Sequence, residues 1–193
     1  MRSAKAQDVT WNATRSPAIQ TSCHRRCILD QTELYTLPNT NVQLLAPPAD
    51  LDFFDQQTIR LSRSVTPLEA WGIMTSRPSP ALRWAFRIRD AISSLFGVKK
   101  ISGFSTASRN TVSVGQKLDF FLVEHVSNEV LSLSARDSHL DVLTCISRNG
   151  KELTITSSVK TYRAFGRIYM LPVAPAHKVI VRSFLRRLKK QCQ

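Results

Sequence analysis

The sequence predicts an α+β fold of the helix-grip type, in which a curved antiparallel sheet wraps around a long C-terminal helix. Two alternating strand patterns, residues 139–147 and 152–162, are joined by the dipeptide Asn149-Gly150, which favours a hairpin turn of type I′. A basic amphipathic segment at residues 175–190 closes the chain. Because a sheet with one apolar face must bury that face, we expect the helical segments to cover it.

The chain is long enough for one domain with a substantial core. Residues 1–42 show weak periodicity and many Thr, Ser, Asn and Gln residues, so we expect an irregular N-terminal segment there. The pair Pro47-Pro48 then introduces a single domain, taken as residues 43–193. Its first strand is expected over about residues 50–63.

Two helices are expected after this strand. Thr66 is a suitable N-cap, with Pro67 at the first helical position and Glu69 at the third. This helix should end near Arg77, because prolines follow that cannot continue it. A second helix is expected from about residue 79 to residue 97, where apolar side chains recur at helical spacing before a glycine.

The remaining strands are expected at residues 117–126, 129–135 and 167–171, in addition to the pair joined by Asn149-Gly150. The final helix should then bury an apolar stripe made of Val179, Ile180, Phe184, Leu185 and Leu188. Its cationic side chains should face solvent, and several lie in the last turns, where they suit the helix dipole: Arg182, Arg186, Arg187, Lys189 and Lys190.

The net charge of +13, from 27 Lys and Arg against 14 Asp and Glu, favours contact with an acidic protein, acidic lipid headgroups or nucleic acid. A merely solvated basic surface is the alternative. Nucleic acid is the least expected partner, because Phe120 and Phe121 lack basic neighbours in their strand. No apolar run reaches the roughly 18 residues that span a bilayer. The start of the chain shows no signal-peptide core, so a cytoplasmic location is expected.

Neither a metal nor a cofactor is expected. Cys23 and Cys27 flank His24, but a zinc site needs four ligands and the second pair is missing. Cys145 lies in a strand pattern and is expected to be a small buried hydrophobic residue. With only 6 Gly in the chain and no phosphate-binding motif, a nucleotide-cradling loop is not expected.

Three groups of residues are candidates for function. His139 and Asp141 alternate with Asp137, so on an unbroken strand they share a face that could act as acid and base or hold a metal. The alternative is a hairpin edge with Asp137 in the turn. His177 opens the expected last helix, where it either caps the helix, packs, or faces a cavity.

Arg167 and Tyr169 form the third group. They alternate on the expected last strand and so share one face. An arginine recognises carboxylate or phosphate groups through two parallel hydrogen bonds, which predicts an anionic part of a ligand at this face. An internal ion pair between Arg167 and Asp141 is the structural alternative.

Four segments carry a family resemblance: Arg89-Asp90 with the following LFGV, residues 137–141 (DSHLD), residues 166–169 (GRIY) and residues 175–181 (PAHKVIV). Their order and spacing resemble the bacterial domain of unknown function 2867, over about residues 50–188. Val142 and Ala176 stand where that family usually has Phe. The resemblance implies a fold of the START and Bet v 1 group, and it carries no established catalytic residues.

These observations predict a protein that binds a small apolar or amphipathic molecule in a cavity between the sheet and the last helix, with Arg167, His139 and Tyr169 as its polar contacts. One alternative is a cyclase- or hydrolase-type enzyme that uses the same cavity, with His139, Asp141 and His177 as the titratable groups. Another is an accessory protein whose basic helix docks on an acidic partner or an anionic membrane. Whether a reaction occurs, the ligand's identity and the oligomeric state stay open.

Overall fold

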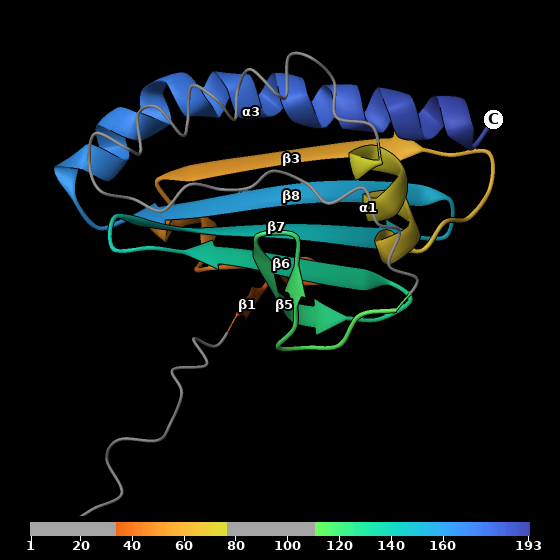
Figure 1. Ribbon diagram of the computed structural model, residues 1–193, viewed down its shortest axis with the longest axis horizontal. Coiled ribbons are helices and arrows are strands. Elements are labelled where there is room, and N and C mark those ends of the chain that lie inside the picture. The colour runs from red at the N-terminus through yellow and green to blue at the C-terminus, as the bar shows by residue number, and fades with distance from the viewer. Residues whose placement is uncertain (1–33, 77–110) are drawn as a thin grey trace, which may run out of the picture. The chain divides into compact units, whose positions relative to one another are not determined.

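The computed structural model describes residues 34–76 and 111–193. Its centre is a six-stranded antiparallel sheet in the order β3-β8-β7-β6-β5-β4 (Figure 1). The strands are β3 (Phe53–Arg60), β4 (Lys117–Leu118), β5 (Phe121–Val126), β6 (Val130–Arg136), β7 (Leu140–Asn149) and β8 (Glu152–Thr161). The sheet and its helices lie in one compact unit, Thr32–Gln193. The expected α+β class and antiparallel sheet are therefore confirmed.

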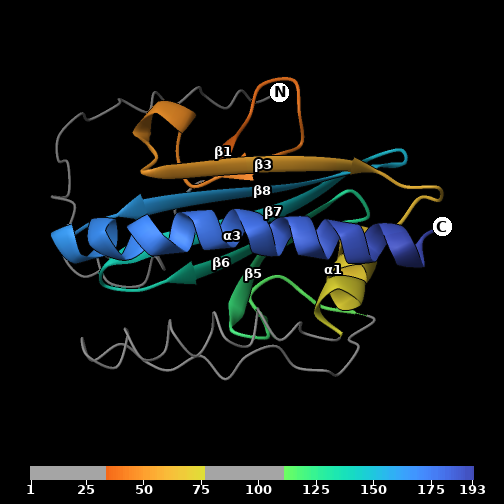
Figure 2. The ribbon, with the colours of Figure 1, turned by 90° about the horizontal axis from the view of Figure 1, so that it is seen from above.

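Different elements cover the two faces of the sheet. The helices α1 (Pro67–Thr75) and α3 (Ala164–Gln191) lie on one face, where they share the main apolar cluster with all the long strands (Figure 2). The short hairpin β1 (Tyr35–Thr36) and β2 (Gln43–Leu44) packs on the other face, followed by a turn of 3-10 helix at Pro48–Asp50. β1 precedes residue 43, at which the domain was expected to begin. Within the described residues no helix is both long and apolar enough to cross a bilayer.

The first expected helix is confirmed as α1. The Thr66 side chain accepts a hydrogen bond from the Glu69 backbone N–H at 3.2 Å, as the capping pattern predicts. Trp71 fixes α1 against the sheet, because its indole N–H donates to the Asp119 carboxylate at 3.1 Å and its ring meets Phe121 edge-on. The second expected helix, residues 79–97, lies outside the described residues.

Two predictions about the sheet are wrong in detail. The segment 117–126 is not one strand but the tight hairpin β4–β5, which turns at Asp119 with a φ of 58°. The β7–β8 turn is not of type I′, which needs positive φ at both loop residues. Its loop residues are Gly150 and Lys151, and of these only Gly150 has a positive φ, of 60°.

The expected last strand, residues 167–171, is wrong, because those residues form the first turns of α3. The helix begins at Ala164 and contains Pro172 and Pro175, which were expected to separate a strand from a helix. Each proline removes one hydrogen bond from the helix. Figure 1 shows the first turns of α3 inclined to the rest, as expected where prolines interrupt the bonding.

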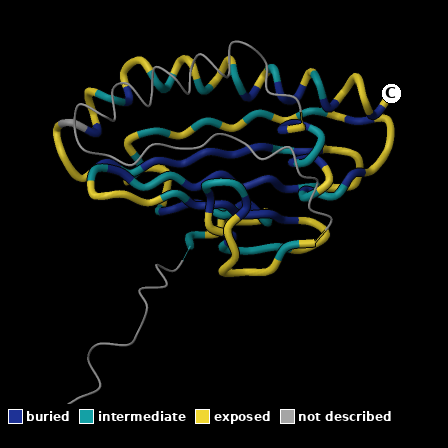
Figure 3. Tube along the Cα trace, in the orientation of Figure 1, coloured by how far each residue is buried: buried dark blue, intermediate teal, exposed yellow. Residues whose placement is uncertain are grey.

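The buried stripe of α3 is partly as expected. Phe184, Leu185 and Leu188 are buried and Ile180 is half-buried, but Val179 is 63% exposed and does not belong to the stripe. Val181 takes its place, because the helical phase that places Phe184, Leu185 and Leu188 inward also turns Val181 to the sheet. Figure 3 shows buried residues recurring along α3 between exposed ones, above the buried central strands.

At Gly166 the backbone of α3 lies close to His139 and Thr161. A Cβ atom at this position would lie 2.8 Å from the His139 carbonyl oxygen and 3.1 Å from the Thr161 Cβ, whereas a Cβ at Gly72 in α1 would meet nothing within 4 Å. We therefore expect Gly166→Ala to lower the free energy of unfolding by about 1–3 kcal/mol through overpacking. Gly72→Ala should raise it by about 0.5–1 kcal/mol, since alanine favours a helix. Urea denaturation of both variants checks this, and a stabilising Gly166→Ala would contradict the close approach.

Arg187 differs from the expectation that it faces solvent freely. It is half-buried, and its guanidinium donates to the Met74 carbonyl oxygen, near the C-terminal end of α1, at 3.2 Å. A cation at that end also interacts favourably with the negative end of the α1 dipole. We expect Arg187→Ala to cost about 1–2 kcal/mol of unfolding free energy. The exposed neighbour Arg186→Ala is the control and should cost under about 0.5 kcal/mol, measured by thermal melts. Equal losses would show that the Met74 contact contributes nothing.

Candidate functional site

A polar row crosses the middle of the helix-covered face. It consists of Asp55 on β3, Ser157 on β8 and Thr144 on β7, which lie directly opposite one another across the three strands. The neighbouring rows on both sides are mostly apolar, and they belong to two different apolar clusters. Ser157 and Thr144 are buried, with exposed fractions of 1% and 8%. The polar row therefore interrupts what would otherwise be one continuous core.

His177 of α3 lies over the polar row. Its Nε2 is 2.9 Å from the Ser157 hydroxyl oxygen, and its ring meets Phe53 edge-on at 5.8 Å between centroids. His177 was expected at the opening of a helix. Because α3 begins at Ala164, the residue is instead in mid-helix and faces the sheet.

Gln57 connects the polar row to the helix backbone. Its side-chain amide donates to the Asp55 carboxylate at 2.7 Å and to the Lys178 carbonyl oxygen at 3.3 Å. Asp55 and Gln57 lie on the same side of β3 as Phe53 and Ile59, which pack into the two apolar clusters. The strand period therefore turns both polar side chains towards α3.

Burial determines the charge state of His177. Its removal from solvent lowers the pKa below the ordinary value of 6.5, and the negative charge of Asp55 opposes this only in part. The imidazole is thus neutral at neutral pH. In a neutral imidazole one ring nitrogen donates a hydrogen bond and the other accepts one. Depending on the tautomer, His177 Nε2 therefore either donates to the Ser157 hydroxyl oxygen or accepts from the hydroxyl group.

The lowered pKa of His177 makes the stability of the fold depend on pH. Between the folded pKa and 6.5 the unfolded chain binds a proton that the folded chain does not, so the free energy of unfolding should fall as the pH drops below 6.5. His177→Gln should remove part of this fall, whereas the control His125→Gln should keep it. Urea midpoints measured at pH 7.5 and pH 5.5 compare the three proteins. An unchanged pH dependence in His177→Gln would contradict the assignment.

The structure does not bring His139 and His177 together. The backbone carbonyl of His139 lies beside Gly166, and His177 follows Gly166 by eleven residues on the same helix. At about 1.5 Å of rise per residue the two histidines are roughly 16 Å apart along α3. The expected joint role of these two side chains in one catalytic site is therefore not supported by their positions.

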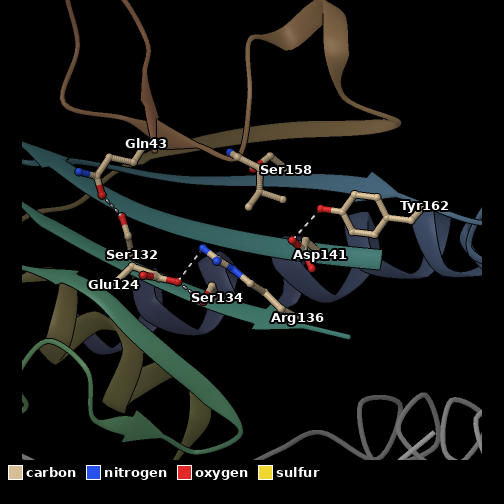
Figure 4. A network of polar contacts seen from close by, with 9 residues as sticks. Gln43, Glu124, Ser132, Ser134, Arg136, Asp141, Ser158 and Tyr162 are labelled. Atoms are coloured by element: carbon tan, nitrogen blue, oxygen red, sulfur yellow. Dashed lines mark hydrogen bonds and ion pairs between the residues drawn. The ribbon is translucent and has the colours of Figure 1, made fainter. Parts of the chain in front are cut away.

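Asp137 and Asp141 also lie apart from the polar row. Asp137 is in the turn before β7, where its carboxylate accepts from the His139 and Leu140 backbone N–H groups, so the hairpin-edge alternative describes it correctly. Asp141 accepts a hydrogen bond from the Tyr162 hydroxyl at 2.8 Å on the opposite face of the sheet (Figure 4). Its partner is thus Tyr162 and not Arg167.

The opposite face carries a second set of polar contacts, drawn in Figure 4. Glu124 accepts from the Ser134 hydroxyl at 2.5 Å and from the Arg136 guanidinium at 3.0 Å, and Ser132 donates to the Gln43 side chain at 2.6 Å. These contacts join the β5 bulge to β6 and the β1–β2 hairpin to the sheet. Because each of these groups is matched by another protein group, we assign the set a structural role.

Arg167 and Tyr169 do not share a face. They lie two residues apart on α3, which separates their side chains by about 200° around the helix axis. Arg167 is exposed, whereas Tyr169 packs against the apolar cluster of Leu140, Val159 and Met170. The expectation of a joint anion-binding pair was therefore wrong, because it depended on a strand in this segment.

The polar row offers hydrogen bonding to a neutral or polar group more readily than it offers covalent chemistry. Ser157 and His177 have the contact of a nucleophile and a base. However, β8 pairs on both edges, so the backbone N–H groups around Ser157 are used by the sheet and do not form an oxyanion hole. Across the described ranges, no three His, Cys, Asp or Glu side chains gather in a way that could hold a metal ion.

Asp55, Gln57 and Ser157 were missed as candidates in the sequence. The signal was nevertheless present, because each stands in phase with an apolar stripe: Asp55 and Gln57 between Phe53 and Ile59, and Ser157 between Ile155 and Val159. Polar residues at inward positions of a strand are costly unless they are paired.

Comparisons with known proteins give one family and one solved structure. A family model described as a protein of unknown function (DUF2867) matches residues 48–184. The crystal structure of a hypothetical protein from Helicobacter pylori aligns at 15% identity, with 76% of this chain and 92% of that chain covered and a TM-score of 0.36. No curated protein matches the chain.

Proposed function

We propose that this chain, which belongs to the DUF2867 family of proteins of unknown function, is a binding protein for a small apolar or amphipathic molecule. The molecule lies between α3 and the sheet, in a START-like helix-grip arrangement. Its polar end contacts the polar row and His177, and its apolar part contacts one of the two apolar clusters beside that row.

The observation that carries this proposal is the interruption of the core by the polar row. A buried hydroxyl with a half-buried imidazole and carboxylate beneath a helix costs stability compared with apolar residues of similar volume. Sequences keep such costly groups mainly where they serve a function. Ligand pockets commonly combine apolar walls with a few polar groups that fix orientation, which is the composition found beside His177.

Native mass spectrometry of the protein purified from cells under mild conditions tests the proposal. We expect a mass above that of the bare chain, and extraction with organic solvent should release a small amphipathic compound. The extracted protein should then bind a fluorescent fatty-acid probe in a saturable manner. A bare mass together with no saturable binding of the probe would refute the proposal.

The contact between Ser157 and His177 also favours one second candidate, a hydrolase of the acyl-transfer type. In that reaction the Ser157 oxygen attacks the acyl carbon of an ester and its proton passes to His177 Nε2. The bond to the leaving oxygen breaks, His177 gives the proton to the departing alcohol, and water then hydrolyses the acyl-serine ester. A fluorophosphonate probe would label Ser157 in such an enzyme but not in the Ser157→Ala variant. Without labelling of the native protein, this second candidate is rejected and the binding proposal stands on its own test.

A further inference from the structure

The charge of α3 is entirely of one sign. The helix contains seven Lys and Arg residues and neither Asp nor Glu. Basic side chains are concentrated in its second half, after Val179. Such a helix attracts an anionic surface over several ångströms, with a strength that depends on ionic strength.

The solvent-facing side of α3, here called the outer face, also carries exposed apolar side chains. Ile168, Leu171 and Val179 are 65%, 73% and 63% exposed. Pro172 and Pro175 are exposed between them. The outer face continues with four exposed cations, Arg182, Arg186, Lys189 and Lys190. Its first half is therefore apolar and its second half basic.

Helical geometry places these residues on one side of α3. At 100° per residue, Ile168, Val179 and Arg186 fall within about 20° of one direction, and the other members lie within about 60° of it. This direction is opposite to the side on which Val181, Phe184 and Leu188 are buried against the sheet. Ile168, Leu171 and Val179 consequently take no part in the apolar clusters that the described residues form.

We propose that the outer face of α3 docks on the surface of an anionic lipid bilayer. An interfacial helix of this kind combines apolar side chains, which enter the headgroup boundary, with cations that pair with acidic lipids. The apolar half is the reason to prefer a bilayer over nucleic acid, because phosphate contacts give no favourable environment to Ile168, Leu171 or Val179. An acidic protein would match the basic half but would need an apolar patch beside its carboxylates.

The two prolines limit how deeply the helix enters the bilayer. Pro172 and Pro175 cannot donate to the carbonyl groups of Ile168 and Leu171, which are the residues four positions earlier. An unpaired carbonyl group is costly in hydrocarbon but is satisfied by water among the headgroups. The outer face therefore lies flat at the level of the headgroups and does not span the membrane.

Vesicle flotation of the full-length protein tests this inference. Vesicles of phosphatidylcholine with about 30% phosphatidylglycerol should bind the protein, and pure phosphatidylcholine vesicles should bind it at least about tenfold more weakly. Binding should also weaken as salt is raised from 50 to 500 mM. Equal binding to both vesicle types, or no binding to either, would overturn the proposal.

Two double variants test the contributions of the basic half and the apolar half of the outer face to vesicle binding. Arg182→Gln with Arg186→Gln should weaken binding by about tenfold or more, and Leu171→Ser with Val179→Ser should weaken it several-fold. The matched control, Arg60→Gln with Lys151→Gln, removes the same charge from exposed sites outside α3 and should leave binding nearly unchanged. A control loss as large as that of the arginine variant would mean that only net charge matters, and would overturn the assignment to α3.

Binding measurements with other polyanions identify the class of partner. Binding to a polyglutamate chain or to a single-stranded oligonucleotide, without binding to the anionic vesicles, would contradict the bilayer proposal. A harmless Leu171→Ser and Val179→Ser variant would likewise contradict it, because the apolar half would then have no contact with lipid. Circular dichroism of each variant confirms that α3 is retained.

Discussion

Phe184→Ala should lower the free energy of unfolding by about 3–5 kcal/mol, the range for truncation of a buried phenylalanine. Phe184 is 9% exposed and lies in the main apolar cluster with Leu188 and with strands from both halves of the sheet. Removal of its ring would leave a cavity where α3 meets the sheet, and close packing prevents the surroundings from filling it completely. Urea denaturation measures the loss directly.

Val179→Ala is the matched control for this prediction. It removes apolar atoms from the same helix, but at a position that is 63% exposed, so the cost should stay below about 0.5 kcal/mol. Similar losses for the two variants would mean that α3 does not pack on the sheet through Phe184. The helix-covered site would then lose its structural basis.

Ser157→Ala should cost about 1–3 kcal/mol of unfolding free energy, because it leaves Nε2 of the half-buried His177 without the hydroxyl group that lies 2.9 Å away. The double variant Ser157→Ala with His177→Phe should be close to neutral, since replacing both partners by apolar groups removes the unpaired atom. The double variant should nevertheless bind an amphipathic ligand ten- to a hundredfold more weakly, which is a loss of about 1.4–2.8 kcal/mol in binding free energy.

A pair of threonine hydroxyl groups on the sheet face away from α3 provides the control for the Ser157 and His177 variants. Thr58 and Thr154 are hydrogen-bonded across β3 and β8 at 2.9 Å, so Thr58→Val with Thr154→Val also removes one side-chain hydrogen bond from the sheet. This variant should keep full ligand binding. A Ser157→Ala variant as stable as the native protein would show that the His177 contact is unimportant for the fold.

The sequence predicted the elements whose signals are local. The Thr66 cap, the antiparallel pairing of β7 with β8 and the burial of Cys145 are all confirmed. These signals depend on hydrogen bonding within a turn or on a period of two along a strand, and so they need no knowledge of the rest of the chain. The burial of Phe184 and Leu188 in α3 was predicted from an equally local signal, the helical spacing of apolar residues.

The start of α3 was mispredicted because two local signals agreed on the wrong answer. Residues 167–171 alternate in polarity like a strand, and Pro172 ends a strand as readily as it interrupts a helix. Contacts with distant residues favour the helix in this segment. Gly166 fits against the His139 carbonyl group, and Met170 packs on Leu140 and Val159. Tertiary packing of this kind overrides local preference.

The candidate site could not be predicted for a related reason. Asp55, Ser157 and His177 come from parts of the chain separated by about a hundred and by twenty residues, and only the strand order β3-β8-β7 and the helical phase of α3 bring them together. His139 and Asp141 were chosen because they are close in sequence. Their distance from His177 follows from the early start of α3, which the sequence did not reveal.

Titration of the delipidated protein with a fluorescent fatty-acid probe tests the central claim most directly. The native protein and the Thr58→Val with Thr154→Val control should bind the probe equally and saturably. The Ser157→Ala with His177→Phe variant, folded and of similar stability, should bind it ten- to a hundredfold more weakly, since it lacks the polar contacts beneath α3. Equal affinity in all three proteins would contradict a ligand site at the polar row.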